Sequence, residues 1–298
     1  MPASSTPHYY YAAAIAAKVT RRRSLLSPAS CYQVMHATAK RCFYLPLLRR
    51  NCLATGRPTL LSRFLHSTTA ATMTTSPSRR GAFILLEGLD RSGKTTQTKL
   101  LAEHLNSLSK PATIAASPAC LLLRFPDRTT AIGAMLDAYL RQSTELDDRA
   151  VHLLFAANRW ECAGRLTAYL TAATHLVVDR YSYSGAAFTA AKGIDLQWCM
   201  AAERGLPAPD VTIFLSVKAE DAEGRGGWGE ERYERAEVQA RVKEQFGRLR
   251  QQEEKRGMQW VEVDGGSGRS IEDIASEIRA IAEQTIERVA HTPLKTME

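Results

Sequence analysis

Gly88-Leu89-Asp90-Arg91-Ser92-Gly93-Lys94-Thr95 is the stretch that decides the fold, because it matches the pattern G-x-x-x-x-G-K-[ST] in the right setting. It follows the apolar run 82–86, which predicts a buried strand, and it opens a helical stretch at 94–109. Glycines in such a loop let successive backbone N–H groups point at phosphate oxygens, and the helix N-terminus reinforces them. The stretch therefore predicts a loop that binds the phosphates of a nucleoside triphosphate.

The residue types in and near this loop suggest separate roles. We expect Lys94 to reach the β- and γ-phosphates and the Thr95 hydroxyl to ligate Mg²⁺. Asp179 follows the apolar run 175–178, the usual place for the carboxylate that holds Mg²⁺ through water. The residues expected to bind ATP and its phosphates are Gly88, Leu89, Asp90, Arg91, Ser92, Gly93, Lys94, Thr95, Thr96 and Arg225.

Short apolar runs alternate with helical stretches along the rest of the chain. The runs lie at 82–86, 175–178, 211–215 and 260–263, and 111–123 is expected to form an extended turn that feeds a further strand. The helical stretches lie at 94–109, 131–141, 147–173, 196–203, 231–256 and 271–289. This alternation predicts an α/β fold: a doubly wound parallel sheet of about five strands flanked by helices, of the P-loop NTP hydrolase type.

The charge of the chain is unevenly distributed. Its 298 residues include 39 Lys+Arg and 31 Asp+Glu, but residues 1–80 hold 12 of the basic residues and no acidic one. Residues 81–298 therefore carry a net charge of −4, which argues against a nucleic-acid partner. No run approaches the roughly 18 consecutive apolar residues of a membrane helix, so we expect no membrane partner.

Residues 1–72 are rich in Arg, Ser, Thr and Ala, the composition of a mitochondrial or plastid transit peptide. The stretch 63–68 also looks like the end of a mitochondrial presequence. The alternative is that translation starts at Met73 and that this leader is rarely or never made. We expect a mitochondrial location if the leader is translated and imported, and a cytoplasmic or nuclear one if the chain starts at Met73. In both cases 73–81 is a linker and 82–298 is the folded domain.

The cysteines of the body, Cys120, Cys162 and Cys199, are scattered singly, and no C-x-x-C pair occurs in the chain. We expect buried thiols there, with neither a disulfide framework nor a structural metal.

Several segments after the loop resemble thymidylate kinase, a family of P-loop nucleoside monophosphate kinases that phosphorylate dTMP to dTDP. These segments lie at 124–130, 151–160, 179–193, 205–210 and 231–234. The resemblance runs from about residue 82 to 294, and the arginine at position 91 matches the eukaryotic branch. It implies ATP as phosphoryl donor, Mg²⁺ as cofactor and a homodimer.

The same resemblance assigns roles to arginines, whose planar fork suits phosphate oxygens. Arg128 and Arg180 look like the clamp on the acceptor phosphate, and Arg91 like the group that meets charge on the transferred phosphoryl. With Lys94 and Asp179, Arg91 and Arg180 form the expected catalytic set. The residues implied for dTMP binding are Asp90, Phe125, Arg128, Phe155, Arg159, Arg180, Ser184, Gly185, Phe188 and Tyr233.

Phe155 and Arg159 stand at i and i+4 of one expected helix and so share a face. The ring could stack on the pyrimidine while the guanidinium donates to a carbonyl oxygen. A core stripe that includes Leu153, Leu154 and Trp160 is the alternative, and the resemblance favours the base pocket. It also implies that Asp90 accepts from the sugar 3′-hydroxyl and that Tyr233 crowds the place of a ribose 2′-hydroxyl.

Residues 220–234 combine four glycines with many charged residues, a composition that does not suit a core element. We expect a small lid that closes over ATP and excludes water, with an ordinary surface loop as the alternative. Arg225 and Arg232 are the arginines of this segment that could assist phosphate binding.

Two other functions remain open. A deoxynucleoside kinase also combines such a loop with arginine-bearing motifs, but it needs a carboxylate base at the acceptor, where arginines are expected here. A P-loop regulatory protein would bind and hydrolyse nucleotide without an acceptor. The chain has neither an N-K-x-D-like segment nor a clear water-positioning glutamine.

Overall fold

The computed structural model describes residues 79–108, 118–218, 232–233, 235–266 and 268–298. The expected leader 1–72 and most of the expected lid, Arg225 included, lie outside these residues, so the transit-peptide and Met73-start interpretations stay predictions.

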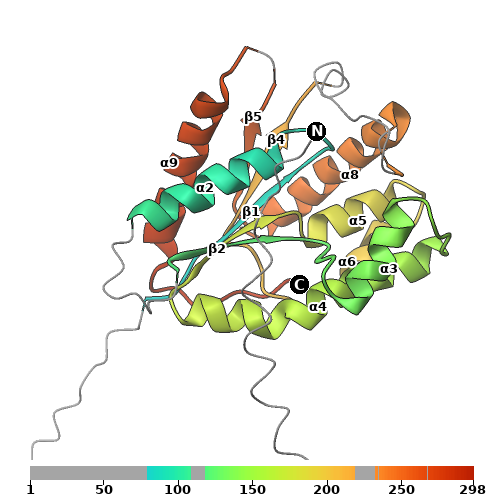
Figure 1. The fold of residues 1–298 in the computed structure, drawn as a ribbon, viewed down its shortest axis with the longest axis horizontal. Helices are drawn as coiled ribbons and strands as arrows, with labels where there is room; N and C mark the ends of the chain where they lie inside the picture. Colours follow the sequence, from blue (N-terminus) through green and yellow to red (C-terminus); the bar gives the residue numbers. More distant parts are fainter. Residues whose placement is uncertain (1–78, 109–117, 219–231, 234, 267) are drawn as a thin grey trace, which may run out of the picture. The chain divides into compact units, whose positions relative to one another are not determined.

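Five parallel strands form one sheet in the order β2-β3-β1-β4-β5 (Figure 1). The strands are β1 (Phe83–Gly88), β2 (Cys120–Arg124), β3 (His175–Asp179), β4 (Val211–Ser216) and β5 (Trp260–Asp264). The helices are α2 (Lys94–Leu108), α3 (Ala131–Leu140), α4 (Asp148–Thr171), α5 (Ser182–Ala190), α6 (Leu196–Ala201), α8 (Ala236–Lys255) and α9 (Ile271–Val289).

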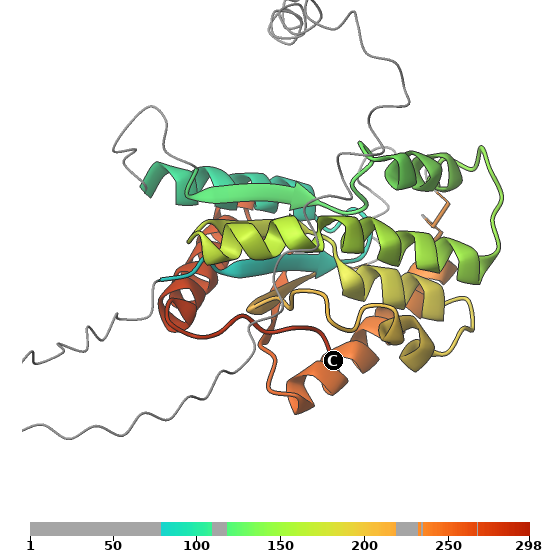
Figure 2. The same ribbon diagram turned by 90° about the horizontal axis from the view of Figure 1, so that it is seen from below.

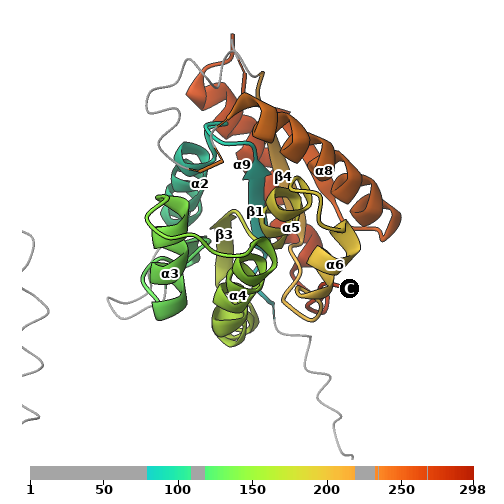
Figure 3. The same ribbon diagram turned by 90° about the vertical axis from the view of Figure 1, so that its right-hand side faces the viewer.

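Helices cover both faces of this sheet, because successive side chains of each strand point to opposite faces. Phe83 and Leu85 of β1 pack into the cluster formed with α4, α5 and α8. Ile84 and Leu86 pack into the cluster formed with α2 and α9. Figure 3 shows the sheet between these two helical layers, and Figure 2, seen from below, shows α4 in front of the sheet. The predicted doubly wound α/β fold is confirmed.

The topology brings the ends of three strands together. The order places β1 between β3 and β4. The chain passes from β1 through α2 to β2 on one side, and the later connection from β3 leads to β4 on the other side, so a crevice opens at the carboxyl edge. The register pairs Asp179 of β3 with Leu86 of β1 on one side and with Arg124 of β2 on the other. The loop that follows β1 therefore lies beside Asp179, the strand-end residue that the sequence analysis paired with it, and also beside Arg124.

Three elements differ from the sequence prediction. Strand β2 begins at Cys120, inside the stretch 111–123 that was expected to be an extended turn, of which 111–117 lie outside the described residues. Helix α5 was not expected, because Ser182–Ala190 shows no amphipathic stripe; nearly all of its residues are buried. Helix α8 begins at Ala236 and not at 231, since Arg235 has an extended backbone and Arg232 and Tyr233 form a turn.

The three body cysteines are buried and have free thiols, as expected. No helix in the described part of the chain combines the length and apolarity needed to cross a membrane.

A buried ion pair ties the start of the described fold to its middle and its end. Arg80, which lies in the expected linker, donates to both carboxylate oxygens of Asp210 at 2.7 Å and to the Thr292 carbonyl at 2.7 Å. Asp210 also accepts from the backbone N–H of Phe83 at 2.8 Å. Because both side chains are almost fully buried, each depends on the other for its hydrogen bonds.

We expect Asp210→Asn to lower the free energy of unfolding by about 3 kcal/mol, because it leaves the Arg80 guanidinium buried with an uncompensated charge. Urea unfolding followed by circular dichroism measures this. Arg250→Gln, which disrupts an exposed ion pair on α8, is the control and should change stability by less than about 1 kcal/mol. Equal effects of the two substitutions would contradict the structural role of Asp210.

Candidate active site

The phosphate-binding loop runs from the end of β1 to the first turn of α2. Its backbone enters the left-handed region at Arg91 (φ 60°) and Gly93 (φ 96°), which curls the chain around a cavity. At Gly88 a Cβ would lie 2.5 Å from the Leu215 carbonyl oxygen, so glycine is needed for the close approach to β4. The cavity measures 580 Å³, and its lining includes loop residues 90–96 together with Arg124, Asp179 and Arg180.

Lys94 is almost completely buried in this loop. Its ammonium donates to the Leu89 carbonyl oxygen at 2.5 Å and to Ser92 Oγ at 3.1 Å. Burial, and next the nearby charge of Arg180, lower the pKa of Lys94 to about 7. The Lys94 side chain is thus held by neutral oxygen atoms of its own loop. Phosphate oxygens that enter the cavity would bring negative charge and favour the charged form of the amine.

Thr95 and Asp179 fit a divalent metal. Thr95 Oγ1 donates to Asp179 Oδ2 at 2.8 Å, and Asp179 Oδ1 is buried with no hydrogen-bond partner among the described residues. Mg²⁺ prefers such oxygen ligands and is usually held by only one or two protein groups plus substrate phosphates and water. The donor set therefore suits Mg²⁺ bound mainly through a nucleotide.

Arg180 lies where the first cavity meets a second one. Its guanidinium donates to the Gly88 carbonyl oxygen at 3.1 Å, to Ser184 Oγ at 3.1 Å and to Asp90 Oδ1 at 2.5 Å. It also lies over the Phe188 ring, 5.4 Å from the centroid. The residue itself has a left-handed backbone (φ 65°), which turns the chain sharply after β3.

Glu87, which the sequence analysis did not single out, holds this turn in place. Its carboxylate is fully buried and accepts from the backbone N–H of Tyr181 at 3.0 Å, the N–H of Ser184 at 3.1 Å and the Ser184 hydroxyl. It thereby caps helix α5, whose N-cap residue makes no side-chain cap of its own. Burial raises the pKa of Glu87, and the Arg180 charge and these hydrogen bonds oppose that rise. An acidic residue inside an apolar strand is the signal that could have identified it.

The second cavity measures 90 Å³ and lies between β2, α4 and α5. Every residue that the resemblance implies for dTMP binding lines it: Asp90, Phe125, Arg128, Phe155, Arg159, Arg180, Ser184, Gly185, Phe188 and Tyr233. Arg124, Pro126, Leu140, Tyr181 and Thr189 complete the lining and were not anticipated. The individual roles of these residues stay predictions.

The alternative interpretation, that residues 153–155 and 160 of α4 form a buried core stripe, is wrong for Leu153 and Trp160. Leu153 is 51% exposed and Trp160 is 43% exposed. Phe155 is partly buried and packs beside Leu136 and Tyr139 while it also lines the second cavity.

Several expected ligand contacts are occupied by protein groups. Asp90, expected to accept from a sugar hydroxyl, accepts from Arg180 and, at 2.6 Å, from the amide of Gln239 on α8. Arg128, expected to clamp a phosphate, donates to Asp137 Oδ1 at 2.7 Å. Gln239 also accepts from the Asp90 N–H at 3.0 Å, and no pattern in the sequence pointed to it.

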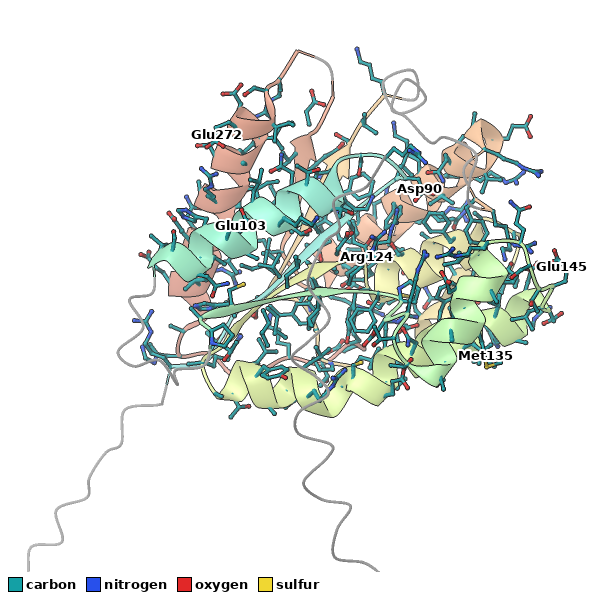
Figure 4. All side chains as sticks on the ribbon, viewed as in Figure 1. Asp90, Glu103, Arg124, Met135, Glu145 and Glu272 are labelled. Atoms are coloured by element: carbon teal, nitrogen blue, oxygen red, sulfur yellow. The ribbon has the colours of Figure 1, made fainter. Side chains whose placement is uncertain are left out.

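Arg232, one of the two arginines of the expected lid, binds the connection between α3 and α4. It donates to both carboxylate oxygens of Glu145, at 2.6 and 3.0 Å, and covers the Tyr139 ring at 4.3 Å. Next to it, the Tyr233 ring contacts Phe188 in the second cavity, 5.2 Å between centroids. Figure 4 labels Asp90 and Arg124, which both line the two cavities, and Glu145, which lies in this connection.

A phosphate-binding loop at the switch point of a parallel sheet, with a second, arginine-lined cavity beside it, defines a P-loop phosphotransferase of the nucleotide-kinase class. Comparisons with known proteins narrow this class. The thymidylate kinase family model matches residues 86–278. The chain is 44% identical to a thymidylate kinase from Dictyostelium discoideum over 74% of this chain and 93% of that protein. It is 42% identical to one from Homo sapiens over 73% and 97%.

Among solved structures, a thymidylate kinase from Candida albicans superposes with a TM-score of 0.64 at 35% identity, covering 74% of this chain and all of that one. This chain belongs to the thymidylate kinase family.

The state of Lys94 predicts a pH dependence. The pKa of Lys94 is about 7 in the loop, and the negative charge of bound phosphates should raise it, so ATP binding is expected to take up a proton above pH 7. The affinity for ATP should therefore fall between pH 7.5 and 9, by up to about tenfold per unit. Isothermal titration calorimetry in two buffers of different ionisation enthalpy measures the uptake. Lys94→Met should bind ATP more weakly and without this uptake; uptake that persists in the variant would assign the proton to another group.

Proposed function

We propose that this protein transfers the γ-phosphoryl group of ATP to dTMP, giving ADP and dTDP for dTTP synthesis. One observation carries the proposal beyond family membership: the loop cavity and the second cavity share Asp90, Arg124 and Arg180 in their linings. A triphosphate in one and a monophosphate in the other would bring donor and acceptor phosphates together at the same three side chains.

The chemistry needs little beyond positioning and charge neutralisation. The oxygen of a monophosphate acceptor is already ionised, so no side chain has to remove a proton from it. Arg180, with Arg91 and Lys94 on the loop side and Arg128 on the acceptor side, supplies fixed positive charge where negative charge accumulates. Asp90 forms an ion pair with Arg180, and Asp137 forms one with Arg128.

Mg²⁺ is the cofactor proposed for this site, held by the Thr95 hydroxyl and, partly through water, by Asp179. When bound with ATP it neutralises charge on the phosphate oxygens. The buried Asp179 Oδ1, unpartnered among the described residues, supports this assignment.

A deoxynucleoside kinase would need a carboxylate able to accept a proton from a sugar hydroxyl. In the second cavity Asp90 is the acidic residue of the described lining, and Arg180 and Gln239 already donate to it. The lining also holds Arg124, Arg128 and Arg159. Such an excess of guanidinium groups suits an acceptor that carries its own phosphate.

A coupled ADP-release assay tests the reaction on the full chain with Mg·ATP and dTMP, dUMP, dCMP, AMP or thymidine as acceptor. We expect a strong preference for dTMP, weaker turnover of dUMP and none of AMP. Turnover of thymidine with dTMP inert would identify a nucleoside kinase. Hydrolysis of ATP independent of every acceptor would support the regulatory alternative.

Arg180→Lys tests the shared position. Lysine keeps the charge but lacks the planar fork, so kcat for dTMP phosphorylation should fall by about 100-fold or more. Arg250→Lys on the exposed face of α8 is the matched control and should leave kcat unchanged. A near-normal kcat of Arg180→Lys would remove Arg180 from the catalytic set.

We also propose that the protein is a homodimer that uses α4. Leu153 and Trp160 are large, exposed and seven residues apart, so they lie on one stripe of this helix. Met135 of α3, which packs against α4, is also exposed. Apolar side chains grouped in this way are typical of a protein–protein interface.

Leu153→Glu should shift the protein from dimer to monomer, because it places a charge in an apolar contact. Analytical ultracentrifugation at micromolar concentration measures the change. Ile271→Glu, a substitution of another exposed apolar residue, at the start of α9, should leave the dimer intact. A monomeric wild-type protein, or a dimer unaffected by Leu153→Glu, would contradict this interface.

A further inference from the structure

Arg159 is held by a partner that does not itself line the substrate cavity. Its Nε donates to Glu203 Oε2 at 2.8 Å, and its Nη2 donates to Glu203 Oε1. Both side chains are almost inaccessible to solvent, at 2% and 0%. Arg159 lines the second cavity, whereas Glu203 stands behind it, in the turn that follows α6.

The backbone that leads to Glu203 is bonded to α4 at two points, one before and one after Arg159 along that helix. Trp160 Nε1 donates to the Ala202 carbonyl oxygen at 2.9 Å, and the buried His152 ring is bonded to the Cys199 carbonyl oxygen at 3.0 Å. Within the turn, the Glu203 N–H donates to the Met200 carbonyl oxygen at 3.0 Å. These contacts fix the backbone position from which the Glu203 side chain reaches Arg159.

Gly185 of α5 lies against the Arg159 guanidinium and restricts its movement. A Cβ at this position would lie 2.6 Å from Arg159 Nη2 and 3.1 Å from Nη1, so the guanidinium packs directly on the backbone of α5. Held between Gly185 and the Glu203 carboxylate, the planar group has one orientation.

This orientation leaves one nitrogen for a ligand. Glu203 occupies Nε and Nη2, and Nη1 makes no hydrogen bond to any residue in the described part of the chain. A guanidinium can only donate hydrogen bonds. It therefore suits an acceptor on the base, such as the 4-keto oxygen of thymine or uracil, and opposes the 4-amino group of cytosine, which is itself a donor.

We propose that Glu203 is a positioning residue that fixes the Arg159 guanidinium as a donor toward position 4 of the bound base, and that the site thereby selects 4-keto over 4-amino pyrimidine monophosphates. The inference rests on the proposed dTMP kinase function. It extends that function because Glu203 would set base selectivity without touching substrate.

The test compares dTMP with dCMP, as kcat/KM and as dissociation constants from calorimetry. In Glu203→Gln the ratio of kcat/KM for dTMP over dCMP should fall by about tenfold to 100-fold, because a loosely held donor no longer penalises the 4-amino group. The KM for ATP should change by less than about twofold. An unchanged ratio in folded Glu203→Gln would overturn the inference.

Asp210→Asn is the matched control, since it disrupts another buried, bidentate arginine–carboxylate pair, far from Arg159 in the sequence and absent from both cavity linings. It should lower stability while leaving the dTMP:dCMP ratio within about twofold of wild type. A similar loss of selectivity in Asp210→Asn would mean that Glu203 acts only through general stability.

A double-mutant cycle tests whether Glu203 acts through Arg159. In an Arg159→Gln background, whose amide can either donate or accept, adding Glu203→Gln should not change the ratio further. A further loss as large as in the wild-type background would contradict the positioning role. If Glu203→Gln does not fold, Gly185→Ala decides, because its Cβ has to displace the guanidinium; an unchanged ratio there would equally overturn the inference.

These results separate the inference from the proposed function. A wild-type protein that turns over neither nucleotide contradicts the kinase function, and calorimetric binding of dTMP and dCMP then still tests the selectivity. A wild-type protein that turns over dTMP, with Glu203 variants of unchanged selectivity, contradicts the inference alone.

Discussion

A buried carboxylate at the end of the central strand organises this active site. Glu87 cannot remain ionised in the core without a full set of hydrogen-bond donors, and it obtains them from the first turn of α5, at Tyr181 and Ser184. That requirement fixes the turn containing Arg180 against β1. Because Glu87 also directly precedes the phosphate-binding loop, the loop and the arginine that faces it belong to one rigid unit.

The charged groups of the site are held by protein contacts that substrates can replace. Arg180 is paired with Asp90, Arg128 with Asp137, and Lys94 with a carbonyl oxygen of its own loop. These groups are thus kept close to the positions that phosphates would occupy, so little reorganisation is needed when they bind. Arg159 differs from them, since its partner Glu203 is buried behind the cavity and stays in place.

Local patterns predicted most of the architecture, and the resemblance to thymidylate kinase predicted the residues that line the second cavity. Apolar runs ending in Gly88 and Asp179 identified buried parallel strands, whose carboxyl ends must meet at one edge. The helical spacing of Phe155 and Arg159 placed both on one face of α4, and both line the second cavity. Helix α5 escaped prediction because its N-terminus is capped by a residue about 95 positions earlier in the chain, which no local window contains.

The sequence by itself determined the loop, the strand-end carboxylate, the fold class and the family, because each depends on residues close together in the chain or on a motif at fixed spacing. Only the tertiary structure decided which charges are paired. Glu203 and Gln239 show no local pattern that marks them, and the only local sign of Glu87 is an acidic residue in an apolar strand, yet each bonds a site residue more than 40 positions away. Burial makes such pairings obligatory, and burial is a property of the packed chain.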